Sequence, residues 1–291
     1  MDFRTLPKSD LHAHISLSAP RASYEGGGAP IPAPPARFGH LHQFLDYIVT
    51  AFGAYFQRPG SSRAATANAL DHMISDRIVY AEPSFDLFVL TMSGEPLESI
   101  IEACAAEVSA RAGKIHVSPD LGIAREIPQE LWMPTAERLL KTGFFEGVDL
   151  YGRELHTDVS DFEHFFDMAR SRGMRIKLHS GEIGDPSRIS RELDIVRPSA
   201  IQHGVRAAED PRLMERLARD EVVLNVCPTS NFRLSVVDEY AGHPIRALYD
   251  AGVKVTLNSD DFAVFDTTVS EEMQKLYDEG MFSLAELERM R

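Results

Sequence analysis

Short apolar strands alternate with amphipathic helices along most of the chain, and this alternation limits the folds that it can adopt. The predicted strands cover residues 6–14, 78–83, 114–123, 147–151, 174–179, 200–203, 222–226 and 253–258. The predicted helices cover residues 38–56, 61–76, 95–112, 128–141, 161–172, 186–196, 211–220 and 243–251, with two shorter ones at 270–277 and 283–291. Such alternation is typical of a parallel sheet. Eight strand-then-helix units predict an α/β protein with the (β/α)8 TIM-barrel fold, whose functional groups lie at the C-terminal ends of the strands.

The whole chain, residues 1–291, is expected to form one barrel domain, since such barrels typically need about 250 residues. Only segment 20–37 interrupts the pattern, because three consecutive glycines, Gly26 to Gly28, and five prolines exclude regular structure there. This loop is either a flexible surface connection or an active-site loop that covers the end of the first strand. Because the last two helices are short, we expect the barrel either to form a homo-oligomer or to leave part of its base exposed.

Composition excludes several classes of function. A net charge of −14 argues against binding to nucleic acid or to anionic membrane surfaces, since both require basic patches. No apolar run reaches the roughly 18 to 20 residues of a membrane span, and no signal peptide precedes the first strand. The two cysteines, Cys104 and Cys227, do not suggest a disulfide framework, so a reducing, cytoplasmic setting is expected. A small-molecule substrate is therefore the expected partner.

The first predicted strand carries two histidines, His12 and His14, two positions apart. Successive side chains of a strand point to opposite faces, so both imidazoles lie on the same face. Two neutral imidazoles supply half of a tetrahedral zinc shell, and the remaining ligands must come from elsewhere in the fold.

Three other strand ends carry residues of the types that bind metals or transfer protons. His179 ends the strand 174–179, His203 ends the strand 200–203, and Asp260 and Asp261 follow the last strand. In a parallel barrel these ends meet at one rim. The sequence therefore predicts a single metal site at the C-terminal ends of the strands.

Seven motifs in this order resemble the adenosine deaminase branch of the metal-dependent amidohydrolase family. They are Leu-Pro-Lys-Ser-Asp-Leu-His-Ala-His at 6–14, Val-Tyr-Ala-Glu at 79–82, Val-Asp-Leu-Tyr-Gly-Arg-Glu at 148–154, His-Ser-Gly-Glu at 179–182, Gln-His-Gly at 202–204, Val-Cys-Pro-Thr-Ser-Asn at 226–231 and Leu-Asn-Ser-Asp-Asp at 257–261. The resemblance implies one Zn²⁺ per chain, bound by His12, His14, His179 and Asp260, with water completing the shell. Zinc lowers the pKa of a bound water toward about 7, which makes hydroxide available at neutral pH.

The same resemblance implies roles for four further residues. His203 would orient the water and act as base or electrostatic partner, while Glu182 would protonate the ring nitrogen next to the attacked carbon. Asp261 would bind the purine ring by a hydrogen bond, and the backbone N–H of Gly152 would meet the opposite ring edge. The implied activity is zinc-dependent hydrolysis of the exocyclic amino group of a 6-aminopurine nucleoside, base or derivative, with release of ammonia or a substituted amine.

The sequence departs from the family pattern near the substrate. Ser16 stands where adenosine deaminases carry an acidic residue that accepts a hydrogen bond from the ribose, and a hydroxyl supplies no fixed negative charge. The loop 20–37 is also expected to replace the helical lid of the family. Two alternatives stay open: hydrolysis of a non-purine amino-heterocycle or amide in the same fold, and a catalytically silent purine-binding protein.

Overall fold

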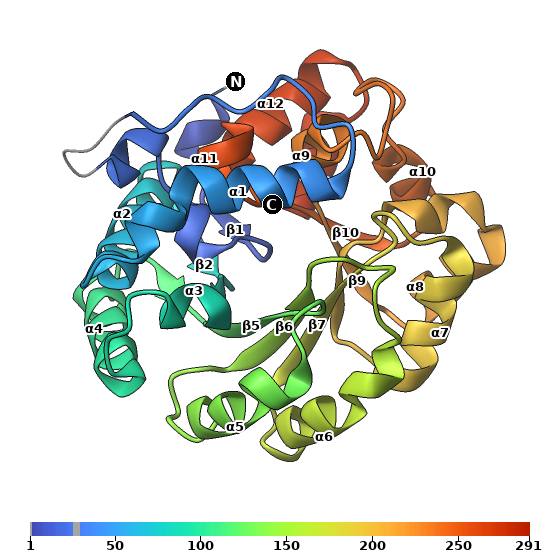
Figure 1. Cartoon of the computed structure of the whole chain (residues 1–291). Helices are drawn as coiled ribbons and strands as arrows, with labels where there is room; N and C mark the ends of the chain where they lie inside the picture. Colours follow the sequence, from blue (N-terminus) through green and yellow to red (C-terminus); the bar gives the residue numbers. More distant parts are fainter. Residues whose placement is uncertain (1, 26–29) are drawn as a thin grey trace.

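A computed structural model describes residues 2–25 and 30–291 and confirms the predicted α/β barrel (Figure 1). The glycine triplet 26–28 of the predicted loop lies outside the described residues. Parallel strands form the inner wall, and the helices surround them in a ring (Figure 1). The described strands are β1 (Lys8–Asp10), β2 (Ile78–Ala81), β3 (Ser84–Asp86), β4 (His116–Val117), β5 (Asp120–Ala124), β6 (Gly147–Tyr151), β7 (Arg175–Ser180), β8 (Ala200–His203), β9 (Val223–Val226) and β10 (Lys254–Leu257).

The barrel wall consists of two sheets joined by single bridges. The strand order is β1-β2-β4 in the smaller sheet and β10-β9-β8-β7-β6-β5-β3 in the larger one, with parallel pairing throughout. Bridges from Ala13 to Asp260 and from His14 to Ser84 connect the segment after β1 to both ends of the larger sheet. The closure of the barrel therefore runs through the histidine-bearing segment itself.

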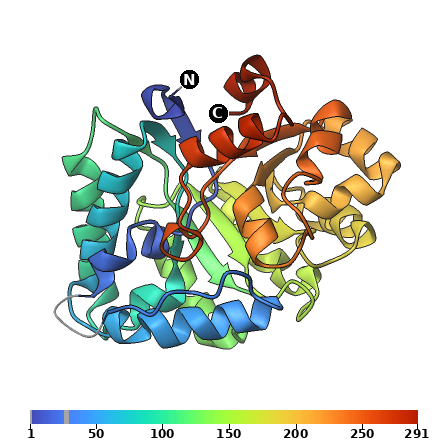
Figure 2. The ribbon, with the colours of Figure 1, turned by 90° about the horizontal axis from the view of Figure 1, so that it is seen from above.

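The helices follow the predicted positions, with short additional ones near the strand ends. They are α1 (Leu41–Phe56), α2 (Ser61–Ser75), α3 (Leu87–Thr91), α4 (Leu97–Ala110), α5 (Gln129–Leu139), α6 (Glu163–Ser171), α7 (Pro186–Val196), α8 (Pro211–Arg219), α9 (Pro228–Arg233), α10 (Ile245–Asp250), α11 (Phe262–Phe265), α12 (Val269–Asp278) and α13 (Leu284–Met290). Figure 2 shows α1 across one end of the barrel, while both termini lie near the other end. None of these helices is long and apolar enough to cross a membrane.

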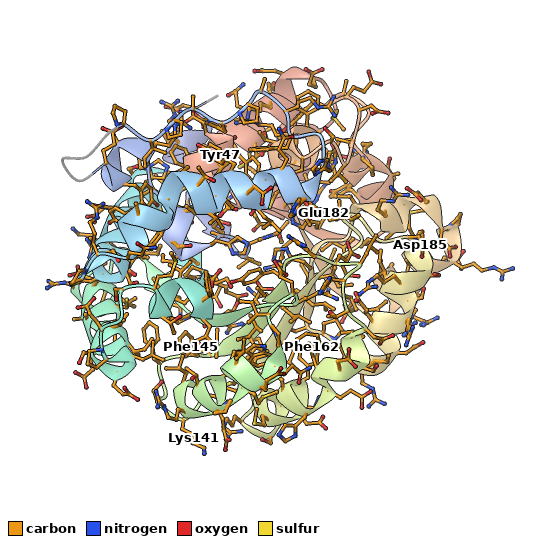
Figure 3. The ribbon with its side chains drawn as sticks, in the orientation of Figure 1. Tyr47, Lys141, Phe145, Phe162, Glu182 and Asp185 are labelled. Carbon is orange, nitrogen blue, oxygen red and sulfur yellow. The ribbon has the colours of Figure 1, made fainter. Side chains whose placement is uncertain are left out.

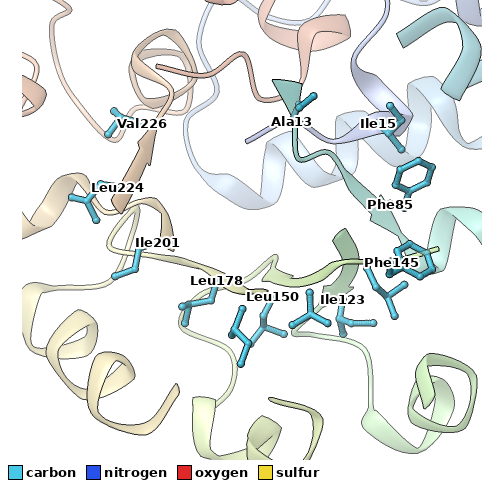
Figure 4. Close-up of a cluster of buried hydrophobic side chains, with 14 of the residues drawn as sticks. Ala13, Ile15, Phe85, Ile123, Phe145, Leu150, Leu178, Ile201, Leu224 and Val226 are labelled. Atoms are coloured by element: carbon cyan, nitrogen blue, oxygen red, sulfur yellow. The ribbon is translucent and has the colours of Figure 1, made fainter. Parts of the chain in front are cut away.

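The main apolar core lies between the strands and the surrounding helices. Strand residues such as Leu150, Leu178 and Ile201 are fully buried and point away from the barrel axis toward the helices (Figure 4). The alternate residues of these strands point inward, because side chains alternate along a strand. These inward positions carry polar groups, including Asp149, Lys177 and His179, so the barrel interior is the polar part of the fold.

A second, separate apolar cluster holds α1 in place. Phe44 and Phe52 of α1 pack there with Tyr24 and Phe38, which flank the Gly/Pro-rich segment, and with Phe265 of α11. Tyr24 and Phe38 therefore help to hold α1 in place.

Candidate active site

The predicted ligands come together at one end of the barrel. The Nε2 atom of His12 lies 3.8 Å from Oδ1 of Asp260, and Nε2 of His14 lies 3.7 Å from the same oxygen. The ring centres of His12 and His179 are 4.7 Å apart. Ligand atoms of His12, His14 and Asp260 lie within 4.8 Å of one another, and so do those of His12, His179 and His203.

The residues at this point fit a bound metal ion. His12 is buried, its Nδ1 lies 3.1 Å from the carbonyl oxygen of Asn225, and its Nε2 has no hydrogen-bond partner. Burial lowers the pKa of His12 well below its usual value, so the imidazole is neutral. A buried lone pair that faces a carboxylate would cost free energy without a cation between them. The donor set of imidazoles and one carboxylate is the set that zinc prefers.

Asp149 is a neighbour of the site that sequence reasoning missed. Its Oδ2 lies 3.4 Å from Nε2 of His179, and its side chain is fully buried on β6. Burial raises the pKa of Asp149, but its electrostatic and hydrogen-bond interactions with His179 outweigh burial and lower the pKa, so the carboxylate is ionised. A charged residue inside the apolar run 147–151 was the sequence feature that could have revealed it. Asp149 adds negative charge beside the metal position.

Glu182 faces His203 in the same pocket. Its Oε1 lies 3.5 Å from Nε2 of His203, and both side chains are buried. Burial, followed by the charges of Asp260 and Glu154, raises the pKa of Glu182 well above its usual value. In Figure 3 Glu182 lies inside the ring of helices, whereas Lys141 lies at its outer edge. Glu182 is therefore a carboxylic acid that can donate a proton at neutral pH.

The residues predicted to bind substrate line one cavity of about 540 Å³ together with the metal and acid groups. Ser16, Gly152 and Asp261 are all part of the lining. Gly152 has a φ of +93°, and a side chain there would collide with the carboxylate of Glu126. Glycine therefore fits this position, which a residue with a side chain could occupy only if Glu126 moved.

Among the described residues, the cover of this cavity comes from α1. Phe44, Ile48, Val49 and Phe52 of α1 line the cavity, and no residue of 20–25 or 30–37 does. A helix thus lies across the barrel end, at the place where the sequence suggested that loop 20–37 replaces a helical lid. Opposite α1, Phe88 of α3 lines the cavity.

Comparisons with known proteins find relatives over nearly the whole chain. The model of the adenosine deaminase family matches residues 32–291. An adenine deaminase of Stutzerimonas stutzeri (strain A1501) is 33% identical over 300 residues, which cover 98% of this chain and 94% of that protein.

Two solved structures share the fold over nearly the whole chain. The adenine deaminase of Arthrobacter aurescens has a TM-score of 0.87 at 26% identity, covering 98% of this chain and 91% of the other. An amidohydrolase of Burkholderia ambifaria, solved with bound Zn, has a TM-score of 0.82 at 21% identity, covering 99% and 84%. The chain therefore belongs to the adenosine deaminase family and is a hydrolytic deaminase.

Proposed function

We propose that this protein is a zinc-dependent deaminase that hydrolyses the exocyclic amino group of a 6-aminopurine and releases ammonia. The observation that carries the proposal is the buried acid Glu182, which lines one cavity with His14 and Asp260, two members of the candidate metal group that also includes His12. His179 would be the fourth protein ligand of one Zn²⁺ per chain. The neighbouring amidohydrolase with bound Zn supports this choice of metal.

Each step of the proposed reaction is then assigned to particular residues of the chain. Bound zinc supplies water that is activated at neutral pH. Glu182 donates its proton to the ring nitrogen next to the amino-bearing carbon, which makes that carbon more electrophilic. Asp261 and the backbone N–H of Gly152 hold the ring at its edges. Overall, one water is consumed: its oxygen bonds to the ring carbon, the bond between that carbon and the amino nitrogen breaks, and its two protons end on the departing ammonia and, by way of Glu182, on the ring nitrogen.

The charges of the cavity favour an uncharged substrate over a nucleotide. Among the described residues of the lining, Arg153 is the only one with a permanent positive charge, and its Nη2 lies 2.7 Å from Nδ1 of His42. The carboxyl groups of Asp46, Asp86 and Glu126 also line the cavity. These groups would repel a phosphate unless it met several cations. We therefore propose a free aminopurine base or a nucleoside, with Ser16 available for a neutral hydrogen bond.

The decisive experiment combines a metal assay with a screen for ammonia release. The zinc-loaded protein would be incubated with adenine, adenosine, AMP and several non-purine amino-heterocycles. We expect one zinc per chain, ammonia release from adenine or adenosine, and a much smaller kcat/KM for AMP. Release from the non-purine compounds alone would refute the purine assignment, and zinc binding without any turnover would refute the assignment as an enzyme.

A further inference from the structure

A chain of buried polar side chains runs from the outside of the barrel to Glu182. The backbone N–H of Ile245 donates to Nδ1 of His243 at 3.1 Å. Nε2 of His243 lies 3.2 Å from Oδ1 of Asn231, and Nδ2 of Asn231 lies 3.1 Å from Nδ1 of His203. Nε2 of His203 in turn faces Glu182 at 3.5 Å. Asn231 is fully buried, and His203 and His243 are each 2% exposed.

The direction of these hydrogen bonds is set by the backbone. A peptide N–H can only donate, so Nδ1 of His243 must offer its lone pair to Ile245. A neutral imidazole carries one proton, which then sits on Nε2 of His243 and is donated to Oδ1 of Asn231. Burial lowers the pKa of His243 to about 3, in keeping with a neutral ring.

The amide of Asn231 transmits this direction to the active site. Because its oxygen accepts from His243, its NH₂ group must face His203. An amide NH₂ has no lone pair to offer, so Nδ1 of His203 must accept and carries no proton. The single proton of a neutral His203 then sits on Nε2, the nitrogen that faces Glu182.

We infer that Asn231 and His243 are positioning residues that hold His203 as a neutral ring with its proton on Nε2. In this form His203 presents an N–H donor to the cavity, and its one lone pair, on Nδ1, is occupied by the amide of Asn231. Its Nε2 is already protonated, and protonation of Nδ1 would set two donors against each other. If the proposed deaminase function holds, His203 therefore acts as an electrostatic partner of the reacting oxygen and not as the general base.

The tautomer can be measured without any turnover. Zinc-loaded protein with ¹⁵N-labelled histidines would be studied by long-range ¹H–¹⁵N NMR, with His203→Gln identifying the signals of His203. We expect Nε2 to be protonated and Nδ1 to be bare in the wild-type protein. Asn231→Asp offers an oxygen to His203 on that side and should move the proton to Nδ1. A wild-type ring with its proton on Nδ1, or a ring that Asn231→Asp leaves unchanged, would overturn the inference whether or not the protein is a deaminase.

Variants of His243 test whether this residue fixes the tautomer of His203 through Asn231. His243→Gln can still accept from Ile245 and donate to Asn231, whereas His243→Leu can do neither. We expect the Gln variant to keep the wild-type tautomer and the Leu variant to give mixed signals for His203. In turnover, Asn231→Asp should lower kcat by about 10²- to 10⁴-fold with little change in KM, as expected for a histidine held in the wrong tautomer. Equal losses of kcat and of zinc in the Gln and Leu variants would indicate a merely structural role and refute the relay.

Discussion

Replacing Lys177 by Met should destabilise the protein strongly, because this side chain is the central cation of the barrel interior. Lys177 is 1% exposed, and its Nζ lies 2.7 Å from both Oε2 of Glu82 and Oδ2 of Asp120. Removing one partner from a buried ion pair typically costs about 3 to 5 kcal/mol. Arg175 still contacts both carboxylates, at 3.3 and 3.0 Å, so we expect the lower end, about 3 kcal/mol.

This loss can be measured by urea unfolding and by thermal melting. A loss of about 3 kcal/mol corresponds to roughly 6 °C in Tm for a chain of this length. Lys254→Met is the matched control, since Lys254 pairs with Glu221 at 2.8 Å on the surface and should cost less than about 1 kcal/mol. Equal stability of the two variants would refute the argument.

The same substitution should weaken zinc binding. Nζ of Lys177 also donates to the carbonyl oxygen of Leu11 at 2.9 Å, directly before His12. Nδ2 of Asn225 donates to the same oxygen at 3.3 Å. Loss of Lys177 leaves the histidine-bearing segment less firmly held, so zinc should dissociate at lower chelator concentration than in Lys254→Met. Unchanged retention of zinc would show that Lys177 supports the barrel but not the site.

Three further predictions concern the active site. Glu182→Gln should keep its zinc and lower kcat by about 10²- to 10⁴-fold, because only the proton donor is lost. Metal analysis measures the zinc content and ammonia release measures kcat. A near-normal kcat would contradict the role of Glu182 as proton donor. Since burial raises the pKa of Glu182, its proton should persist through neutral pH, and loss of this proton should lower turnover on the alkaline side. A pH–rate profile without a fall on the alkaline side would contradict this. Removing zinc should lower Tm, because metal at about 100 times its Kd contributes about 2.7 kcal/mol to stability; an equal Tm with and without zinc would contradict a metal site at His12 and Asp260.

The site residues at the strand ends could be predicted because each of them directly follows or ends a predicted strand in the sequence. The predicted strand 6–14 ends at Asp10 in the structure, so His12 and His14 lie in the bridged segment after β1 and not on one strand face. The barrel rule placed His179 and Asp260 at the same end. These residues line the cavity or lie next to it, because parallel strands end at the same rim of the barrel. The fold followed from the strand–helix alternation for the same reason.

Contacts between distant segments could not be read from the sequence. The role of α1 as cover depends on its packing against Tyr24 and Phe265, which no local pattern indicates. The link between Asn231 and His243 requires the turn after α9 to bring the two side chains together. The strand predicted at 78–83 ends at Ala81 in the structure, and a further strand, β3, follows at Ser84 and belongs to the other sheet.

The two apolar clusters stabilise different parts of the protein: one packs the barrel, and the other holds the helix α1 that covers the cavity. The barrel core and the cluster under α1 share almost no members, with partly buried Val236 packed against both. Substitutions on the inner face of α1, at positions such as Ile48 and Val49, can alter which molecules enter without weakening the barrel that holds the catalytic groups. Libraries restricted to this helix should therefore yield folded proteins with new substrate ranges more often than libraries in the strands.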